Sequence, residues 1–385
     1  MKISSQAARG FEASLIHQLR IKQNVSRAEL ARSMETAPST IGQYVDRLID
    51  DGFLKEGRKA VLPSGRWPTV LELNPRVGRF VGIDFEARQL MATAVDFAQQ
   101  PLQQYQASIL ASDTVDQVID KIAQAVLHVS RKGEPLLGVG IGVPGVVDSE
   151  NGIALHYRYL RGWTNVPLAE RLVDRLGVPV FLENNIRVMA LAEQLFGQGR
   201  GVDNFICVGI RSGIGAGVVV DGELHRGPGN VAGEIGGWPC GQGRTLEEFA
   251  SLSALSEQIV DAIRNGESSS LVVKRNRVAI DDLIAAAKSG DELVVDAICG
   301  AGQIIGRVVA QMNLLLNPEK VILAGPLGQL EQAFVQSVRE AIEPYCRPPH
   351  AVAPLIFGSE LGLFGGALGG AALVARRWEP QRLAG

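Results

Sequence analysis

Apolar residues follow two different periods along this chain, and the change falls near residue 80. Before that point they recur every three to four residues, which predicts short amphipathic helices. After it, runs of valine, isoleucine and leucine end in glycine-rich turns and alternate with helical stretches, which predicts an α/β arrangement. The pattern therefore predicts a small helical module, residues 1–79, joined to a large α/β module, residues 80–385.

The first module has the pattern of a winged helix-turn-helix. An apolar stripe predicts a helix over residues 13–19, and the capping-box residues Ser26 and Glu29 predict the start of a second helix. Pro38 opens a third helix after a tight turn. Two strand-like segments within residues 53–73 surround a basic turn, which predicts a wing.

Polar side chains line the outer face of the predicted third helix. Glutamine suits adenine, and arginine suits guanine or phosphate in a major groove. The alternative is an ordinary solvated face on a small helical domain. The basic wing favours DNA, because its cations can follow the phosphates. We therefore expect double-stranded operator DNA to be bound by Ser39, Thr40, Gln43, Arg47, Arg58, Lys59 and Arg66.

The formal net charge of −3 conceals a difference between the two modules. Residues 1–79 contain 13 Lys and Arg against 8 Asp and Glu, a net charge of +5, and the remainder carries −8. This positive charge is modest, so specificity must rest on paired recognition helices. We therefore expect a homodimer or homotetramer.

The cysteine spacing and the N-terminal sequence favour a cytoplasmic protein. The 4 cysteines lie far apart without a C-x-x-C pair, and the first 23 residues lack a signal peptide's apolar segment. The longest apolar run, residues 361–375, contains five glycines and is too short to span a bilayer. It predicts a core helix, and we expect no membrane partner.

Ordered motifs in the large module carry a family resemblance. They include Gly142-Val143-Pro144-Gly145, Glu183-Asn184-Asn185, Gly213-Ile214-Gly215-Ala216-Gly217, Gly233-Glu234-Ile235-Gly236 and Leu246-Glu247. Together they resemble the ROK family (repressors, open reading frames, kinases), in particular its NagC/XylR-type regulators. The resemblance implies an actin-like, ribonuclease H-like two-lobed sugar-kinase fold. One lobe would span about residues 80–195 plus the C-terminal helix, and the other about residues 196–360.

Departures from the family motifs separate a regulator from an enzyme. ROK kinases carry Glu-Asn-Asp, in which the Asp is the general base, whereas this chain has Asn185. A neutral amide cannot accept the proton, and losing a general base costs roughly 10²–10⁴ in rate. Glu86 stands where a phosphate-binding glycine is expected, and Arg211 replaces the first glycine of a second loop. We therefore expect a DNA-binding regulator, a repressor of carbohydrate genes, without catalytic residues.

Two other classes of function are compatible with the sequence. One is an ATP-dependent sugar kinase of the ROK type with an extra N-terminal domain. The other is a scaffold that binds no sugar and acts through protein partners.

The resemblance also bears on metal and ligand. The family's structural zinc site has lost its His at Gly237 and keeps only Cys240 of four ligands, so we expect no metal and no cofactor. The positions that hold sugar hydroxyls in the family are Asn184, Asn185, Glu234 and Glu247, with Gly145 and Gly233 close to the ring. We expect a carbohydrate effector there. Alternatively, Asn184 and Glu234 cap helices or brace turns. Arg211 fits either an acidic ligand or a salt bridge.

Overall fold

The computed structural model describes the chain at residues 5–22, 24–59, 69–86, 88–130, 133–157, 159–274, 276–347 and 352–380. Contacts within the chain define two compact units. The first comprises residues 1–184 and 366–385, and the second comprises residues 185–365. The chain therefore passes between the units twice, once after Asn184 and once after Gly365.

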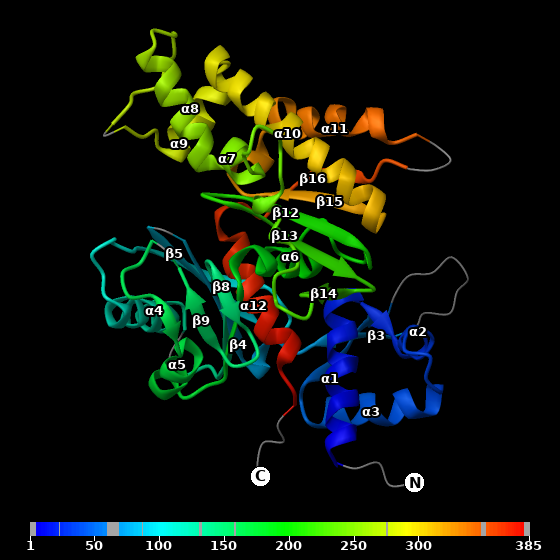
Figure 1. The fold of residues 1–385 in the computed structure, drawn as a ribbon. Helices are drawn as coiled ribbons and strands as arrows, with labels where there is room; N and C mark the ends of the chain where they lie inside the picture. The colour runs from blue at the N-terminus through cyan, green and yellow to red at the C-terminus, as the bar shows by residue number, and fades with distance from the viewer. Residues whose placement is uncertain are drawn as a thin grey trace. The chain divides into compact units, whose positions relative to one another are not determined.

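The first unit begins with three helices and a small sheet of order β1-β3-β2 (Figure 1). The capping box of Ser26 and Glu29 is formed, and Pro38 lies in the first turn of the third helix, as the sequence predicts. The first helix is longer than the predicted residues 13–19, because residues of good helix propensity extend it beyond the apolar stripe. The elements are α1 (Ser5–Lys22), β1 (Val25–Ser26), α2 (Arg27–Ser33), α3 (Pro38–Asp50), β2 (Leu54–Lys59), β3 (Thr69–Leu73) and η1 (Pro75–Val77).

A five-stranded mixed sheet of order β11-β7-β4-β5-β6 follows in the same unit. β4, β5 and β6 form an antiparallel meander, and β7 and β11 add parallel strands. β7 reads as a continuous run of apolar residues and glycines, and β4 is mostly apolar, because both of their faces are buried. The strands are β4 (Arg79–Glu86), β5 (Gln89–Asp96), β6 (Pro101–Ser108), β7 (Leu136–Val143) and β11 (Val180–Asn184).

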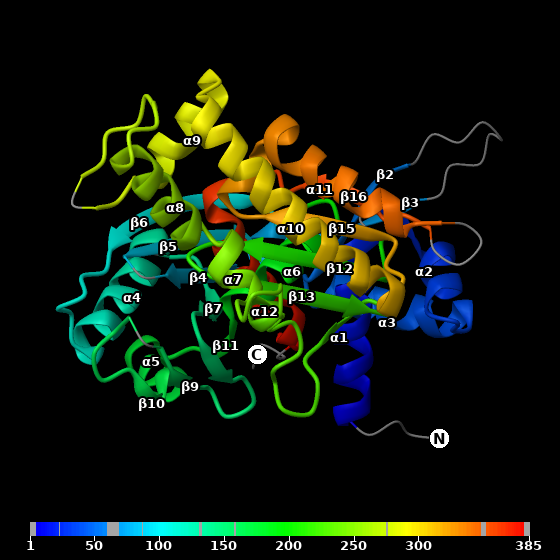
Figure 2. The same cartoon turned by 45° about the horizontal axis from the view of Figure 1, so that its top comes forward.

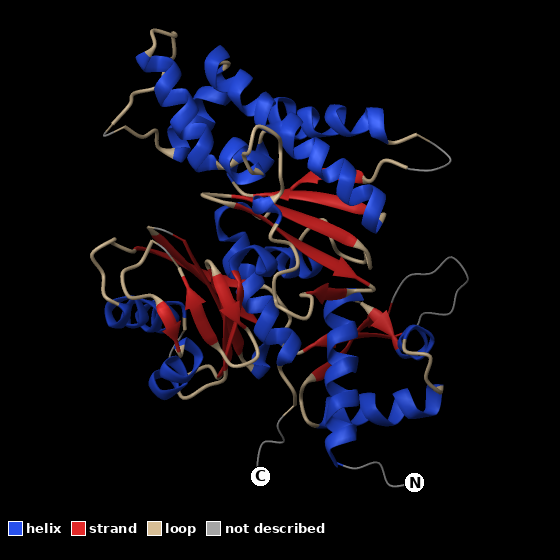
Figure 3. Cartoon of the chain, in the orientation of Figure 1, coloured by secondary structure: helices blue, strands red, loops and turns tan. Residues whose placement is uncertain are grey.

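Helices cover both faces of this sheet (Figure 3). Val81 and Ile83 of β4 point toward the core that contains α4, whereas Gly82 points toward α12. α12 contains most of the apolar run predicted as a glycine-rich core helix. The remaining elements are α4 (Val115–Val129), β8 (Val146–Asp148), β9 (Ile153–His156), β10 (Thr164–Val166), α5 (Leu168–Leu176) and α12 (Gly365–Arg377).

The second unit repeats the strand arrangement of the first. Its sheet has the order β14-β13-β12-β15-β16, again three antiparallel strands followed by two parallel ones. Its strands are β12 (Phe205–Ile210), β13 (Ile214–Val220), β14 (Glu223–His225), β15 (Lys320–Ala324) and β16 (Leu355–Gly358).

The helices of the second unit also cover both sheet faces (Figure 2). α10 is long and apolar enough to cross a membrane, but half of that apolar stretch is buried in the unit's core, as in core helices generally. The helices are α6 (Asn185–Phe196), η2 (Ile235–Gly237), α7 (Leu246–Ala250), α8 (Leu252–Arg264), α9 (Ile280–Ser289), α10 (Glu292–Leu316), η3 (Pro326–Gln329), η4 (Glu331–Val335), α11 (Gln336–Ile342), η5 (Glu343–Tyr345) and η6 (Gly362–Phe364).

Candidate DNA-reading and sugar-binding sites

The outer face of α3 carries most of the predicted base-reading side chains. The inner face of the helix buries Ile41, Tyr44, Val45 and Leu48. On the opposite side Ser39 and Gln43 are exposed and Thr40 is half-buried. Polar side chains that can donate and accept hydrogen bonds are therefore presented at the start and middle of one helical face, as a recognition helix requires.

Arg47 lies differently from the free cation that the sequence suggests. Its Nη1 forms an ion pair with Glu12 Oε1 of α1 at 3.1 Å, and its guanidinium carbon lies 5.2 Å from the ring centre of Tyr44. The side chain still keeps about two fifths of its surface exposed, 43%. Its charge is thus partly neutralised within the protein, which sequence spacing did not predict because Glu12 is 35 residues away.

The wing supplies fewer described cations than predicted. Arg58 and Lys59 lie at the end of β2, but their side chains are outside the described part, and Arg66 lies outside the described residues altogether. Lys55 faces Glu72 across the β2–β3 pair, with Nζ and Oε2 3.1 Å apart. Arg32, exposed in the last turn of α2, is a cation that the sequence analysis passed over.

Two of the predicted sugar-binding residues, Gly145 and Asn184, meet in the first unit. Asn184 ends β11, and its Nδ2 donates a hydrogen bond to the carbonyl oxygen of Gly145 at 3.0 Å. Gly145 has φ +79, and a Cβ there would lie 2.2 Å from the carbonyl oxygen of His156. Only glycine fits this turn. The amide of Asn184 therefore joins the end of β11 to this turn.

Glu183, the residue before Asn184, is held by hydrogen bonds of its own. Its carboxylate, fully buried, accepts hydrogen bonds from Ser149 Oγ at 3.2 Å and from the backbone N–H of Asn184 at 2.9 Å. A buried carboxylate needs such partners to offset its desolvation.

The other four predicted sugar-binding residues belong to the second unit. Asn185 begins α6 and is buried. Gly233 has φ +89 and lies so close to β13 that a Cβ would be 1.9 Å from the carbonyl oxygen of Ala216. Glu234 immediately precedes η2, and Glu247 lies in the first turn of α7.

Glu247 lies close enough to Glu234 to affect that carboxyl electrostatically. Burial raises the pKa of the Glu234 carboxyl, the guanidinium of Arg187 lowers it, and the carboxylate of Glu247 raises it. Glu247 Oε2 also accepts a hydrogen bond from the backbone N–H of Ile214 at 3.4 Å. Paired carboxylates of this kind supply several acceptors for hydroxyl groups.

Arg187 is a residue of this site that the sequence analysis missed. It is buried on α6, donates a hydrogen bond from Nη2 to the carbonyl oxygen of Asn230, and places that nitrogen 4.0 Å from Glu234 Oε1. It therefore anchors the loop that carries Gly233 and Glu234. The available signal was an arginine within the apolar first half of α6, because charged side chains are rarely buried without a partner.

The segments around Glu86 and Arg211, which the resemblance compares with phosphate loops, lie at a strand end and in a strand turn. Asp84 of β4 is fully buried, and Glu86 ends the strand. Arg211, also buried, lies in the β12–β13 turn, where its backbone N–H donates to the carbonyl oxygen of Gly213 at 2.8 Å.

Among the described residues, no group of three or more His, Cys, Asp and Glu side chains lies in a metal-binding arrangement. Cys240 is a half-buried free thiol, and burial raises its pKa.

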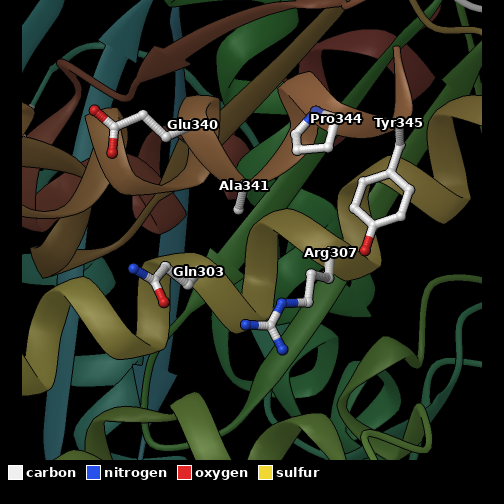
Figure 4. Close-up of a pocket in the computed structure, with 6 residues that line it drawn as sticks. All are labelled: Gln303, Arg307, Glu340, Ala341, Pro344 and Tyr345. Carbon is white, nitrogen blue, oxygen red and sulfur yellow. The ribbon is translucent and has the colours of Figure 1, made fainter. Parts of the chain in front are cut away.

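A cavity of about 270 Å³ lies between α10 and the α11–η5 segment (Figure 4). Gln303 and Arg307 of α10 face the opposite wall across it. Its lining is Gln303, Arg307, Glu340, Ala341, Pro344 and Tyr345. None of the predicted sugar-binding residues is among them, so this cavity is separate from the predicted site.

Comparison with known proteins identifies the class and then the family. A solved structure of a ROK family transcriptional regulator, a homolog of the E. coli MLC protein, superposes with a TM-score of 0.76 at 27% identity and covers 96% of each chain. The fold class is therefore that of the actin-like sugar kinases with a small domain before it. The ROK family model matches residues 80–377, and the chain belongs to the ROK family.

Two relatives show the range of proteins similar to this chain. The xylose repressor of Caldicellulosiruptor bescii is 28% identical over 83% of this chain and 83% of its own length. The glucokinase of Thermotoga maritima is 30% identical over 78% of this chain and 98% of its own length. The chain is thus similar to both repressors and kinases of the family.

Proposed function

We propose that this protein is a sequence-specific transcriptional regulator, a repressor of carbohydrate uptake or catabolism genes, whose ROK domain binds a sugar or sugar derivative. The observation that carries the proposal is the share of this chain that each similar protein covers. The similar regulator structure spans 96% of this chain, whereas the glucokinase, matched over nearly its whole length, spans 78%. The remainder fits the three helices and small sheet that precede β4, which present Ser39 and Gln43 outward.

The ROK domain acts as a sensor rather than as a kinase. Asn185 occupies the position of the general base, and a neutral amide cannot accept the proton of a sugar hydroxyl. Glu86 and Arg211 stand in the two former phosphate loops, where a carboxylate repels a polyphosphate and a bulky side chain fills its space. The 30% identity to a glucokinase makes ATP-dependent phosphorylation the alternative to test.

The residues proposed to bind the effector are Gly145 and Asn184 in the first unit and Asn185, Gly233, Glu234 and Glu247 in the second. Support comes from the proximity of Glu234 to Glu247 and from the anchoring of their loop by Arg187. Two protomers are proposed to bind paired half-sites, because one recognition helix in one groove gives modest specificity. The regulator would act on DNA in the cytoplasm, without metal or cofactor.

The DNA claim is tested by selecting binding sites from random duplexes with the full-length protein. We expect enrichment of a paired motif, and at least about tenfold weaker binding when Ser39→Ala and Gln43→Ala are combined, since a good base contact contributes roughly 1–3 kcal/mol. Gln104→Ala, which removes an exposed glutamine from β6, is the matched control and should bind as the parent does. Absence of any enriched motif would contradict the proposal.

The sensor claim is tested by thermal unfolding with a panel of pentoses, hexoses and amino sugars, and by a coupled ADP-release assay with the same panel. One sugar should stabilise the protein by about 2.7 kcal/mol at 100 times its dissociation constant. Glu234→Ala should abolish that stabilisation, and no sugar should be phosphorylated. ATP turnover that disappears in Glu234→Ala would instead establish the kinase, and no stabilisation by any sugar would favour the scaffold.

A further inference from the structure

The helix α1 carries a fully buried arginine toward the C-terminal helix α12. Arg20 is 1% exposed, and its Nη1 donates a hydrogen bond to the carbonyl oxygen of Ala375. Ala375 lies in the last turn of α12, where backbone carbonyls lack partners within the helix. Arg20 therefore caps α12 from another helix, and its positive charge complements the negative end of the helix dipole.

Three aromatic rings surround the same guanidinium. Its central carbon lies 5.0 Å from the ring centre of Phe80, 4.8 Å from that of Phe97 and 5.9 Å from that of Trp378. These rings belong to β4, to the turn after β5 and to the segment after α12. Phe53, which precedes β2, also belongs to this cluster, because its ring centre lies 5.5 Å from that of Trp378. The contact thus joins the DNA-reading module to the large module within one unit.

This arrangement is energetically unfavourable for a purely structural contact. Arg20 Nε and Nη2 and His17 Nδ1 are buried without a hydrogen-bond partner in the described structure. Burial lowers the pKa of Arg20 to about 9, and burial with the charges of Arg376 and Arg20 lowers the pKa of His17 to about 4. An apolar side chain would fill the space without this penalty. Packing stability alone does not account for an arginine here.

α1 and α12 both connect to parts that carry function. Through Glu12, α1 holds Arg47 of the recognition helix α3. α12 starts at Gly365, where the chain passes from the second unit back to the first. A change in the position of α12 therefore has a continuous path of helices and ion pairs to α3.

We propose that Arg20 is a latch that fixes the DNA-reading module on α12 and couples displacements of α12 to the recognition helix. The proposal rests on the proposed DNA-binding function for its biological meaning, but the latch itself is testable in the free protein. Breaking it should loosen the module without changing the DNA contacts on α3, because Ser39 and Gln43 lie on the outer face of α3.

Hydrogen exchange of the full-length protein tests the latch. Arg20→Met keeps the length of the side chain but can neither cap Ala375 nor act as a cation toward the rings. We expect about tenfold faster exchange in α1 and in the last turn of α12, with β12 and β15 unchanged. Arg9→Met, which removes an exposed arginine from the same helix, is the matched control and should exchange as the parent does. Unchanged or slower exchange in Arg20→Met would overturn the latch.

Trp378→Leu provides a second variant that opens the cage from the α12 side. It should also speed exchange in α1, and the double variant should add little to either single change, because both remove the same contact. Fully additive effects would contradict a shared latch. If Arg20→Met does not fold, Trp378→Leu alone decides the matter, and unchanged exchange in α1 of that variant would overturn the latch.

Selection from random duplexes tests the coupling. Parent and Arg20→Met should enrich the same half-site, but the parent should enrich one fixed spacing and Arg20→Met a broader range of spacings. Identical spacing preferences would overturn the coupling. If the parent enriches nothing, the proposed DNA-binding function fails, and the exchange measurements still decide whether Arg20 is a latch.

Discussion

The two units share one strand order, but in each unit the sheet packs against a helix in a different way. In the first unit, Gly82 lets α12 approach backbone to backbone, and a Cβ there would lie 1.8 Å from the carbonyl oxygen of Ala367. In the second unit, Gly209 and Gly215 accommodate the side chain of Ile186 from α6, with a Cβ at Gly209 lying 2.7 Å from Ile186 Cδ1.

This difference predicts different tolerance to change. A backbone carbonyl cannot move without displacing its helix, whereas the end of an isoleucine side chain can change rotamer. The α12 contact is therefore a rigid junction, suited to the helix that meets Arg20. The α6 contact is adjustable, and α6 begins with the proposed sugar-binding residue Asn185.

The largest expected effect comes from adding one methyl group at each junction. Gly82→Ala should lower the free energy of unfolding by about 4 kcal/mol or more, or prevent folding, because the new methyl meets backbone. Gly209→Ala should cost about 1–3 kcal/mol, because Ile186 can yield. Urea unfolding of the full-length protein measures both changes.

A compensating substitution sharpens the same comparison. Ile186→Val removes Cδ1, which lies 2.7 Å from the methyl of Gly209→Ala, but keeps Cγ2 at 2.8 Å, so the double variant should regain only part of the lost stability. Equal losses for Gly82→Ala and Gly209→Ala, or no recovery in the double variant, would show that the two junctions do not differ.

The next largest effect is the change of stability with pH that a titratable side chain in each unit causes. His17 on α1 has a pKa of about 4, against an ordinary value of 6.5. Between these values the unfolded chain binds the proton more readily than the folded protein, so stability falls as pH is lowered through this range. The loss between pH 7 and pH 4 should be about 3 kcal/mol, since a tenfold difference in proton affinity corresponds to about 1.4 kcal/mol.

His17→Leu isolates this contribution. As the pH is lowered from 7 to 4, the parent should lose about 3 kcal/mol of unfolding free energy relative to His17→Leu. His128→Leu is the comparison variant. The ring centre of His128 lies 4.2 Å from that of Tyr105, with the two rings tilted. A pH-independent difference for His17→Leu would refute the burial of a neutral imidazole.

Local sequence signals were sufficient for much of the first unit. Ser26, Glu29 and Pro38 act within one helical turn, so their capping roles are readable from sequence alone. Arg20 lies four residues after the buried Ile16, on the same helical face, but an arginine there is ordinarily expected to reach solvent. Its burial depends on rings supplied by residues 80, 97 and 378, which no local pattern brings together.

The candidate sugar site shows the same limit. Family motifs pointed to Asn184 and Glu234 as candidate residues, but they did not predict which contacts the side-chain atoms make. The amide of Asn184 is committed to Gly145, and Glu234 lies beside Arg187, which no motif includes. Both facts arise from tertiary contacts that join segments distant in sequence.

The smallest expected effect is the response of the second unit to rising pH, opposite in direction to that of His17. Burial raises the pKa of Glu193 on α6. The hydrogen bonds donated by Ser359 Oγ and the backbone N–H of Gln198 lower it, but burial has the larger effect. The folded protein then holds this proton more readily than the unfolded chain, so stability falls as pH rises above 4.5 until the folded pKa is passed.

Glu193→Gln should remove that decline, because the amide does not titrate. The stability difference between variant and parent should therefore grow in the variant's favour above pH 4.5 and then level off. Glu257→Gln, at an exposed carboxyl on α8, should show no such growth in parallel urea titrations. A flat difference for Glu193→Gln would contradict the raised pKa of Glu193 in the folded protein.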